Sequence, residues 1–341
     1  KTLQKNLINM KSLIIGLGFG QLYKRVLEKM GHQVITVDIN SKHNPMFLEL
    51  TTALATHPEY DTVHICTPNN THYTIAQKVA PHSKMVFIEK PGVQNAQQWQ
   101  ILVSSNKNTK FIMTKNNMWR TKIWLDGIKT KVVDNDIIDI NWRNINFIPN
   151  PGGWFTNKAL AYGGVSRDLL PHLLSIFIAI NPNTYKDFKL TKFHKEQKNT
   201  LKELIEETYE TTGDNRAGNY GTMNPNGVYD VDDLVELEFN NNEKTYRLTA
   251  DWKAGKGFSA SGRKDDEQED DIAVHFNKSG ETKKEDEQHP FQIGICPESA
   301  YERMIADCIT HKDDNAFWQK QLEYDLWIHE IITNDDETII H

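Results

Sequence analysis

Cysteine is scarce in this sequence, and long apolar runs are missing. The three cysteines, Cys66, Cys296 and Cys308, do not make a disulfide framework, which favours a reducing compartment. They form no Cys-x-x-Cys pair and no Cys/His spacing typical of zinc, so no metal site is predicted. The apolar runs fall well short of the ~20 residues that cross a bilayer, and residues 1–9 lack the apolar stretch of a signal peptide. We therefore expect a cytoplasmic protein with no membrane partner.

An excess of basic residues is also missing. Lys and Arg number 39 and Asp and Glu number 46, which leaves a net charge of −7. This mild acidity argues against a nucleic-acid binder, which usually presents a basic face. The aromatic content of 10% is too high for wholesale disorder. At roughly 100–200 residues per domain, the length predicts two domains.

Short apolar runs alternate with helical patterns in the first third of the chain. The spacing predicts helices near residues 21–30 and 71–80. Strands are predicted at residues 12–15, 33–37, 62–66, 85–88 and 110–113. Parallel strands need crossover connections, which these helices supply, so residues 10–120 are predicted to form a doubly wound parallel sheet of the α/β class.

The pattern changes near residue 120, where a second domain, residues 121–341, is predicted. Residues 231–239 and 244–252 alternate like antiparallel strands, joined by a polar turn at 240–243. A further strand is expected at 136–147. Helices are expected at 121–133, 164–180, 298–310 and 315–333. This half is expected to carry a mainly antiparallel sheet.

Two polar stretches interrupt the second half. Residues 211–230 are rich in Gly, Asn and Thr and are expected to form a loop. Residues 265–271 are almost entirely acidic, which is typical of a solvated face; a cation or partner site is the alternative.

A glycine turn, Gly16-Leu-Gly18-Phe-Gly20-Gln21, lies between the first predicted strand and helix. Gly16 permits a tight turn, Gly18 lets the backbone approach a pyrophosphate, and the N–H groups at the helix start hold the anion. Gln21 stands where a third Gly or Ala is usual, and Gly20 comes one position early. The context predicts a dinucleotide site, with a structural glycine turn as the alternative.

Asp38 ends the second predicted strand, about twenty residues after the turn. A carboxylate there can accept hydrogen bonds from ribose hydroxyls and repels a 2′-phosphate, so NAD is favoured over NADP. Lys42 is near enough to soften that preference. Asp38 could instead be a helix cap or a turn residue.

Two motifs follow later strands of the same sheet. Cys66-Thr-Pro-Asn-Asn-Thr-His72 lies beyond a carboxyl end, where ligands of such sheets bind. It could also be a helix entry capped by Thr71 or Asn70. Glu89-Lys90-Pro91 follows the next strand, and its lysine could transfer a proton or polarise a substrate oxygen. An ordinary surface lysine is the alternative.

A fourth motif, Gly163-Gly-Val-Ser-Arg-Asp168-Leu-Leu-Pro-His172, lies in the second half. Asp168 and His172 are four residues apart, so one face of a helix would carry both. A carboxylate beside an imidazole can orient it and raise its basicity. A purely structural pair is the alternative, and no third metal ligand is evident.

Together and in this order, the motifs resemble the Gfo/Idh/MocA oxidoreductase family, which includes glucose-fructose oxidoreductase and inositol dehydrogenase. The resemblance spans roughly residues 11–333. The matching pieces are GLGFG at 16–20, TPNNTH at 67–72, EKP at 89–91, GGVSRDLLPH at 163–172 and PESAYERMI at 297–305. The sequence departs from the family at Gln21 and at Leu170-Pro171, where a Gly-Ser-like pair is common.

The resemblance implies a Rossmann domain followed by an α/β domain whose open sheet carries the substrate site and often a subunit interface. It implies NAD(P)-dependent oxidation or reduction of a sugar, polyol or nucleotide-sugar carbon, in a homodimer or homotetramer. Lys90, Asp168 and His172 match the family's catalytic residues. The residues expected on the cofactor side are Gly16, Gly18, Phe19, Gly20, Asp38, Thr67, Pro68, Asn69, His72, Glu89 and Lys90.

The substrate side is predicted from aromatic and basic residues near the motifs, because sugars stack on aromatic rings and need hydrogen-bond partners. The candidates are Trp119, Arg120, Trp154, Tyr162 and Arg167, and ordinary packing is the alternative for each. Two other functions remain open at this point. One is a dinucleotide-binding regulator of the same fold without turnover, and the other is a reductase of a non-sugar imine or carbonyl.

Overall fold

A computed structural model describes most of the chain. The described residues are 9–143, 148–212, 223–253, 272–279, 291–292 and 296–334, with the backbone alone for 208–212. The acidic run at 265–271, and residues 213–222 of the predicted loop at 211–230, lie outside them. The chain divides into two compact units. The first comprises Lys1–Arg120 and Pro297–Thr333, and the second Thr121–Cys296 and Asn334–His341.

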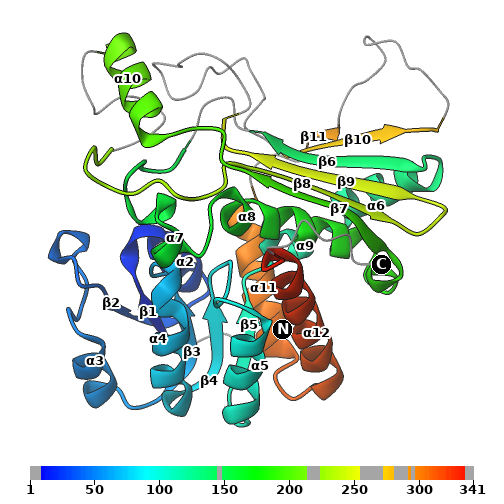
Figure 1. The fold of residues 1–341 in the computed structure, drawn as a ribbon. Helices are drawn as coiled ribbons and strands as arrows, with labels where there is room; N and C mark the ends of the chain where they lie inside the picture. Colours follow the sequence, from blue (N-terminus) through cyan, green and yellow to red (C-terminus); the bar gives the residue numbers. More distant parts are fainter. Residues whose placement is uncertain are drawn as a thin grey trace. The chain divides into compact units, whose positions relative to one another are not determined.

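The first unit is built on a five-stranded sheet in the order β2-β1-β3-β4-β5 (Figure 1). Its strands are β1 (Lys11–Ile15), β2 (Gln33–Val37), β3 (Tyr60–Ile65), β4 (Ser83–Ile88) and β5 (Lys110–Met113). All pairings are parallel. The predicted parallel sheet is confirmed. The chain reverses its direction of winding between β1 and β3, which is where α/β sheets bind ligands.

Helices connect these strands. They are α2 (Leu17–Lys29), α3 (Leu50–Thr56), α4 (His72–Val79) and α5 (Ala96–Ser105), with the short 3-10 helices η1 (Ser41–His43), η2 (Asn69–Thr71), η3 (Ala80–His82) and η4 (Asn116–Trp119). Helix α2 buries Tyr23, Val26 and Leu27 along one stripe. Helix α5, which the sequence did not predict, begins where the side chain of Asn95 accepts the N–H of Gln98.

The last two helices, α11 (Glu298–Thr310) and α12 (Asn315–Ile332), belong to the first unit. The sequence predicted their bounds well but assigned them to the second domain, and the structure corrects that assignment. Met304 and Ile305 are fully buried in one cluster with Ile14. Burying each such side chain contributes about 1.5–3 kcal/mol. The apolar stripe of a helix shows that it needs a partner without showing which sheet provides it.

The second unit holds a six-stranded sheet in the order β11-β10-β6-β9-β8-β7 (Figure 1). Its strands are β6 (Ile137–Arg143), β7 (Lys189–Glu196), β8 (Leu234–Asn240), β9 (Thr245–Asp251), β10 (Ala273–Asn277) and β11 (Phe291–Gln292). The pairing of β6 with β9 is parallel, and the other four pairings are antiparallel. The predicted, mainly antiparallel sheet is therefore confirmed, and β8 and β9 form the predicted hairpin.

One face of this sheet is apolar and the other is polar. Leu237 and Phe239 of β8 are buried, and Phe177 stacks on Phe239 with 5.0 Å between ring centroids. On the opposite face, Arg247 bonds to Glu238 at 3.1 Å. The helices of this unit are α6 (Lys122–Val133), α7 (Lys158–Ala161), α8 (Val165–Asp168), α9 (Leu170–Ile180) and α10 (Leu201–Thr212), with the short 3-10 helices η5 (Trp154–Thr156) and η6 (Tyr185–Asp187).

The long apolar helix predicted at 164–180 is broken into α8 and α9. Pro171 stands in the first turn of α9, where its missing N–H does no harm, but it cannot continue a helix from α8. In the described part of the chain, no single helix is long and apolar enough to cross a membrane. The helical segments Lys158–Asp168 and Leu170–Ile180 are bent by 40° relative to each other. Only when the two are taken together are their length and composition those of a membrane-spanning helix.

Candidate active site

The glycine turn lies at the switch point of the parallel sheet. Gly16 follows β1 with φ of +89°, and its N–H donates to the carbonyl of Val37 at 2.9 Å. A Cβ at this position would come within 2.7 Å of the carbonyl oxygen of Cys66, which follows β3. Any residue other than glycine would therefore clash with the end of β3.

The next two glycines have opposite surroundings. A Cβ on Gly18 would have no neighbour within 4 Å, so the start of α2 is open there. A Cβ on Gly20 would come within 2.8 Å of Ile14 Cγ2. Gly20 thus provides the close helix-to-strand packing usually expected one position later, where this chain has Gln21. An open, glycine-lined helix start fits a pyrophosphate, because the free N–H groups and the helix dipole both favour an anion.

Asp38 is buried at the end of β2 and accepts three hydrogen bonds. The donors are the N–H of Leu17 at 2.5 Å, the N–H of Asn40 at 2.7 Å and His43 Nδ1 at 2.9 Å. Burial alone would raise the pKa of Asp38, but these bonds together hold it below its ordinary value. Asp38 is therefore a carboxylate, with about one of its four lone-pair sites left for a ribose hydroxyl.

The loop after β3 is organised by His72, which is fully buried. Its Nε2 lies 2.7 Å from the carbonyl oxygen of Thr67, and its Nδ1 lies 2.7 Å from the carbonyl oxygen of Gly92. Thr71 takes the N-cap position of α4, but its side chain makes no capping bond. The structure thus places His72 as a bridge between two loops. Asn69, another predicted cofactor residue, is also buried.

The loop after β4 carries Glu89 and Lys90. Glu89 is buried, and the phenol of Tyr23 donates to its Oε1 at 2.6 Å. Burial raises the pKa of Glu89, and the bond from Tyr23 and the charge of Lys90 offset part of that rise. Lys90 itself is half-buried at the carboxyl edge of the sheet.

In the second unit, Asp168 ends α8 and His172 lies in the first turn of α9. The indole N–H of Trp252 donates to Asp168 Oδ2 at 3.0 Å, and the Trp142 ring lies 5.3 Å from the His172 ring between centroids. Asp168 and His172 stand on two short helices rather than on the single predicted helix, since the helix is interrupted at Leu169. A tryptophan side chain lies beside each of the two residues.

Sequence reasoning missed the aspartates of residues 229–233, which hold the motif around Asp168. Asp232 accepts the N–H groups of Gly164 at 3.1 Å and Ser166 at 2.7 Å and the Ser166 hydroxyl at 3.0 Å, which satisfies donors at the start of α8. Asp230 accepts the N–H of Lys158 at the start of α7. The sequence does carry a signal for these aspartates, because they stand directly before the strand β8.

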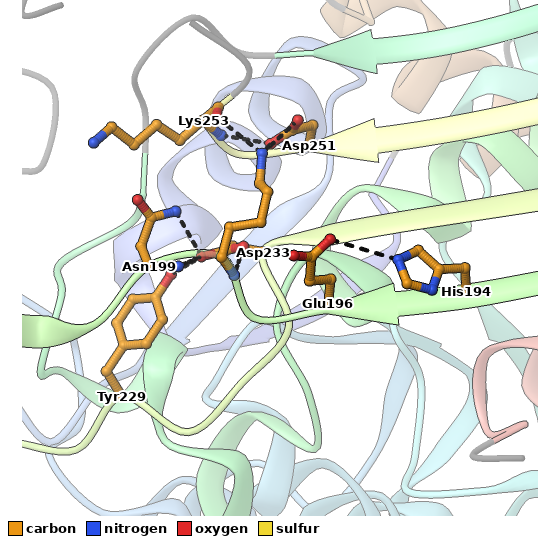
Figure 2. Close-up of polar contacts among 8 residues, drawn as sticks. His194, Glu196, Asn199, Tyr229, Asp233, Asp251 and Lys253 are labelled. Carbon is orange, nitrogen blue, oxygen red and sulfur yellow. Dashed lines mark hydrogen bonds and ion pairs between the residues drawn. The ribbon is translucent and has the colours of Figure 1, made fainter. Parts of the chain in front are cut away.

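Asp233 is fully buried and organises the adjoining loop (Figure 2). Its oxygens accept the Tyr229 phenol at 2.8 Å, the Asn199 N–H at 3.0 Å and the Lys198 N–H at 2.7 Å. Lys198 Nζ reaches both oxygens of Asp251 at 2.7 Å. These bonds tie the segment after β7 to residues 229–233 and to Asp251 at the end of β9.

The five substrate-side candidates fall in both units. Trp119 donates its indole N–H to Asp307 at 2.9 Å, and Arg120 donates to Asn117 at 2.8 Å. In the second unit, Arg167 is buried, Tyr162 has a φ of +68°, and the Trp154 ring packs on its neighbour Phe155. Among the described residues, no three His, Cys, Asp or Glu side chains form a group that could hold a metal ion.

A comparison with known families finds a match within the first unit. Residues 10–116 match the model of an oxidoreductase family with an NAD-binding Rossmann fold, Gfo/Idh/MocA. The matched region contains the glycine turn, Asp38 and Lys90, and the expectation of an NAD-binding Rossmann domain is confirmed.

Known proteins resemble more of the chain at low identity. A putative UDP-kanosamine synthase oxidoreductase subunit of Amycolatopsis mediterranei is 23% identical over 181 residues, which are 49% of this chain and 50% of that protein. The match thus spans about half the length of this curated relative. GenD2 from gentamicin A biosynthesis, solved with NAD, has a TM-score of 0.67 at 13% identity, covering 95% of this chain and 93% of its own.

Levoglucosan dehydrogenase, solved with NADH and levoglucosan, has a TM-score of 0.63 at 14% identity, covering 95% of this chain and 96% of its own. At such identities the two structures establish that this chain shares their fold.

Proposed function

We propose that this chain is an NAD-dependent oxidoreductase that moves a hydride between nicotinamide and a hydroxyl-bearing or carbonyl carbon of a sugar, polyol or nucleotide sugar. The observation that carries the proposal is the open glycine turn beside the carboxylate of Asp38, within a domain of an NAD-binding oxidoreductase family. The names of the relatives, which include a UDP-kanosamine synthase subunit and levoglucosan dehydrogenase, support a carbohydrate substrate.

On the cofactor side, the backbone N–H groups of Gly18, Phe19 and Gly20 hold the pyrophosphate at the start of α2. Asp38 accepts a ribose hydroxyl and repels the 2′-phosphate of NADP. The loops at 67–69 and 89–90 follow neighbouring strands and border the same carboxyl edge. Bound NAD supplies a carbon that accepts or returns a hydride.

On the substrate side, we assign proton transfer to Lys90 and His172. The imidazole of His172 takes the proton of the reacting hydroxyl, and the ammonium of Lys90 stabilises the alkoxide that develops and can relay the proton. The carboxylate of Asp168 orients either His172 or Lys90. Each proton-transfer residue is expected to contribute about 10²–10⁴-fold to the rate.

The second unit is proposed to form the substrate side, with Trp154, Tyr162 and Arg167 as candidates to contact the sugar. The first unit would contribute Trp119 and Arg120. The polar face of the six-stranded sheet is proposed to support a homodimer or homotetramer, which light scattering of the purified protein would detect. We propose a cytoplasmic location.

The test is a spectrophotometric screen of the purified protein. Free sugars, polyols and nucleotide sugars are offered with NAD, and carbonyl compounds with NADH, while absorbance at the reduced-nicotinamide band is followed. Lys90→Ala and His172→Ala should each lose at least about 100-fold in kcat. Lys84→Ala is the matched control, since Lys84 lies exposed on β4, the strand that precedes Lys90, and pairs with Asp61. Tight NAD binding with no turnover on any substrate would favour a regulator.

A further inference from the structure

One peptide unit of the Lys90 loop is held between two buried histidines. The carbonyl of Gly92 faces His72 Nδ1 at 2.7 Å, and the N–H of Val93 donates to His329 Nε2 at 3.1 Å. Both histidines are fully buried. His72 begins α4 and His329 lies near the end of α12, so both polar groups of this one peptide face side chains from distant parts of the sequence.

The tautomer of His329 follows from its two contacts. Its Nδ1 lies 2.6 Å from the carbonyl oxygen of Asp325, which can only accept, so Nδ1 carries the proton. Its Nε2 is then the acceptor for Val93. The ring stacks on Trp99 with 5.0 Å between centroids. A Cβ on Gly92 would come within 2.5 Å of His329 Nε2, so the approach requires glycine.

His72 meets an acceptor at each ring nitrogen. Its Nε2 lies 2.7 Å from Thr67 O, so the two full hydrogen bonds need a proton on both nitrogens. Burial is the main effect that lowers the pKa of His72, and the charge of Lys90 adds to it. The contacts with the two carbonyls raise this pKa, but the net shift is downward. A neutral ring donates one bond at a time, either to the Lys90 loop or to the loop after β3.

We propose that His72 and His329 are positioning residues for Lys90, acting through the Gly92–Val93 peptide. Lys90 is two residues from that peptide, on the loop that follows β4 at the carboxyl edge of the parallel sheet. Removing either histidine partner leaves a buried carbonyl or N–H unsatisfied, and the loop must move to recover water or another partner. The consequence for turnover rests on the proposed function, in which Lys90 handles the substrate oxygen.

Paired substitutions separate the individual bonds. His72→Asn places an amide nitrogen near the site of Nδ1 and keeps a donor for Gly92, whereas His72→Gln reaches the site of Nε2 and keeps a donor for Thr67. His329→Gln keeps an acceptor for Val93, whereas His329→Phe keeps the ring on Trp99 and removes the acceptor. We expect His72→Gln and His329→Phe to lower kcat about 10–100-fold, since small displacements of reacting groups carry such costs.

His329→Gln should retain most of the wild-type kcat with a KM for NAD that changes less than threefold, and His72→Asn should keep a higher kcat than His72→Gln. His64→Asn is the matched control: His64 is also a fully buried histidine of this unit, bonded to Thr62 at 3.0 Å. It should lower the melting temperature without lowering kcat. Equal kcat losses in both members of a pair, in proportion to the loss of stability, would overturn the proposal.

A measurement without substrate separates this proposal from the proposed function. Reductive methylation with 13C-formaldehyde labels the lysines, and Lys90→Arg identifies the Lys90 signal by NMR. That signal should shift in His72→Gln and His329→Phe and stay in place in His64→Asn. If it shifts while no sugar or polyol is turned over, the positioning role stands and the proposed function fails. An unchanged Lys90 signal in both variants would sink the positioning role.

Discussion

The backbone N–H of Leu17 donates to Asp38 Oδ2 at 2.5 Å and so joins the start of α2 to the end of β2. The same carboxylate is expected to accept a hydrogen bond from a ribose hydroxyl of NAD. Binding and structure therefore share one side chain, and the two roles must be separated by measurements that respond to only one of them.

Asp38→Asn should weaken NAD binding about tenfold, since the amide keeps one acceptor oxygen but loses the charge that strengthens a bond to a ribose hydroxyl. The ratio of NADP to NAD affinity should rise, because the repulsion of a 2′-phosphate disappears. Fluorescence titration with NADH and NADPH gives both numbers. Asn40→Ala serves as the control, because Asn40 meets Asp38 through its backbone N–H. An unchanged affinity ratio would remove Asp38 from cofactor selection.

Acid should remove the contribution that Asp38 makes to the stability of the fold. The folded pKa of Asp38 lies below its unfolded value, so its ionised form stabilises the fold above roughly pH 4. That stability is lost as the pH falls through the folded pKa. The difference in unfolding free energy between wild type and Asp38→Asn should therefore be constant near neutrality and shrink below about pH 4. Urea denaturation at several pH values measures it, and a difference that grows in acid would contradict the assignment.

The same substitution, glycine to alanine, should have different effects at Gly18 and at Gly20. Gly20→Ala pushes a methyl against Ile14 and should cost about 1–3 kcal/mol of stability by overpacking. Gly18→Ala meets open space and should leave the melting temperature nearly unchanged. Its methyl instead intrudes where a pyrophosphate would lie, so NADH affinity should fall. If Gly18→Ala binds NADH like wild type, the pyrophosphate does not approach this turn.

The contrast between these glycines shows what the sequence could predict. The turn, the strand before it and the helix after it were predictable from local spacing, because backbone sterics act over a few residues. That Gly20 replaces the usual third glycine was not predictable, since it depends on how closely α2 approaches Ile14 of β1.

Long-range packing caused the other differences. The bounds of α11 and α12 followed from apolar periodicity, but their place in the first unit depends on contacts with residues almost three hundred positions earlier, such as Ile14. The interruption at Leu169 follows from Pro171, which the sequence displayed. Asp232 was missed because its partners at 164 and 166 are brought to it by the fold.

The buried ion pair of Lys115 and Asp325 connects the end of β5 to α12, and both side chains are almost fully buried. Burial raises the pKa of Asp325 to about 6 although the charge of Lys115 lowers it, so the carboxylate is ionised at neutral pH. Asp325→Asn leaves an ammonium without its counter-charge and should destabilise the fold by about 3–5 kcal/mol. The exposed pair of Lys84 and Asp61 should contribute only about 0–1 kcal/mol.

A double-mutant cycle isolates the pair. Lys115→Met with Asp325→Asn removes both charges, so its loss of stability should be clearly smaller than the sum of the two single losses, as buried pairs replaced together often cost little. Because α12 also carries His329, which holds the peptide after Gly92, the single variants should weaken the Lys90 loop as well as the fold. Urea denaturation of the four proteins measures the coupling, and strictly additive losses would show that the two charges do not stabilise each other.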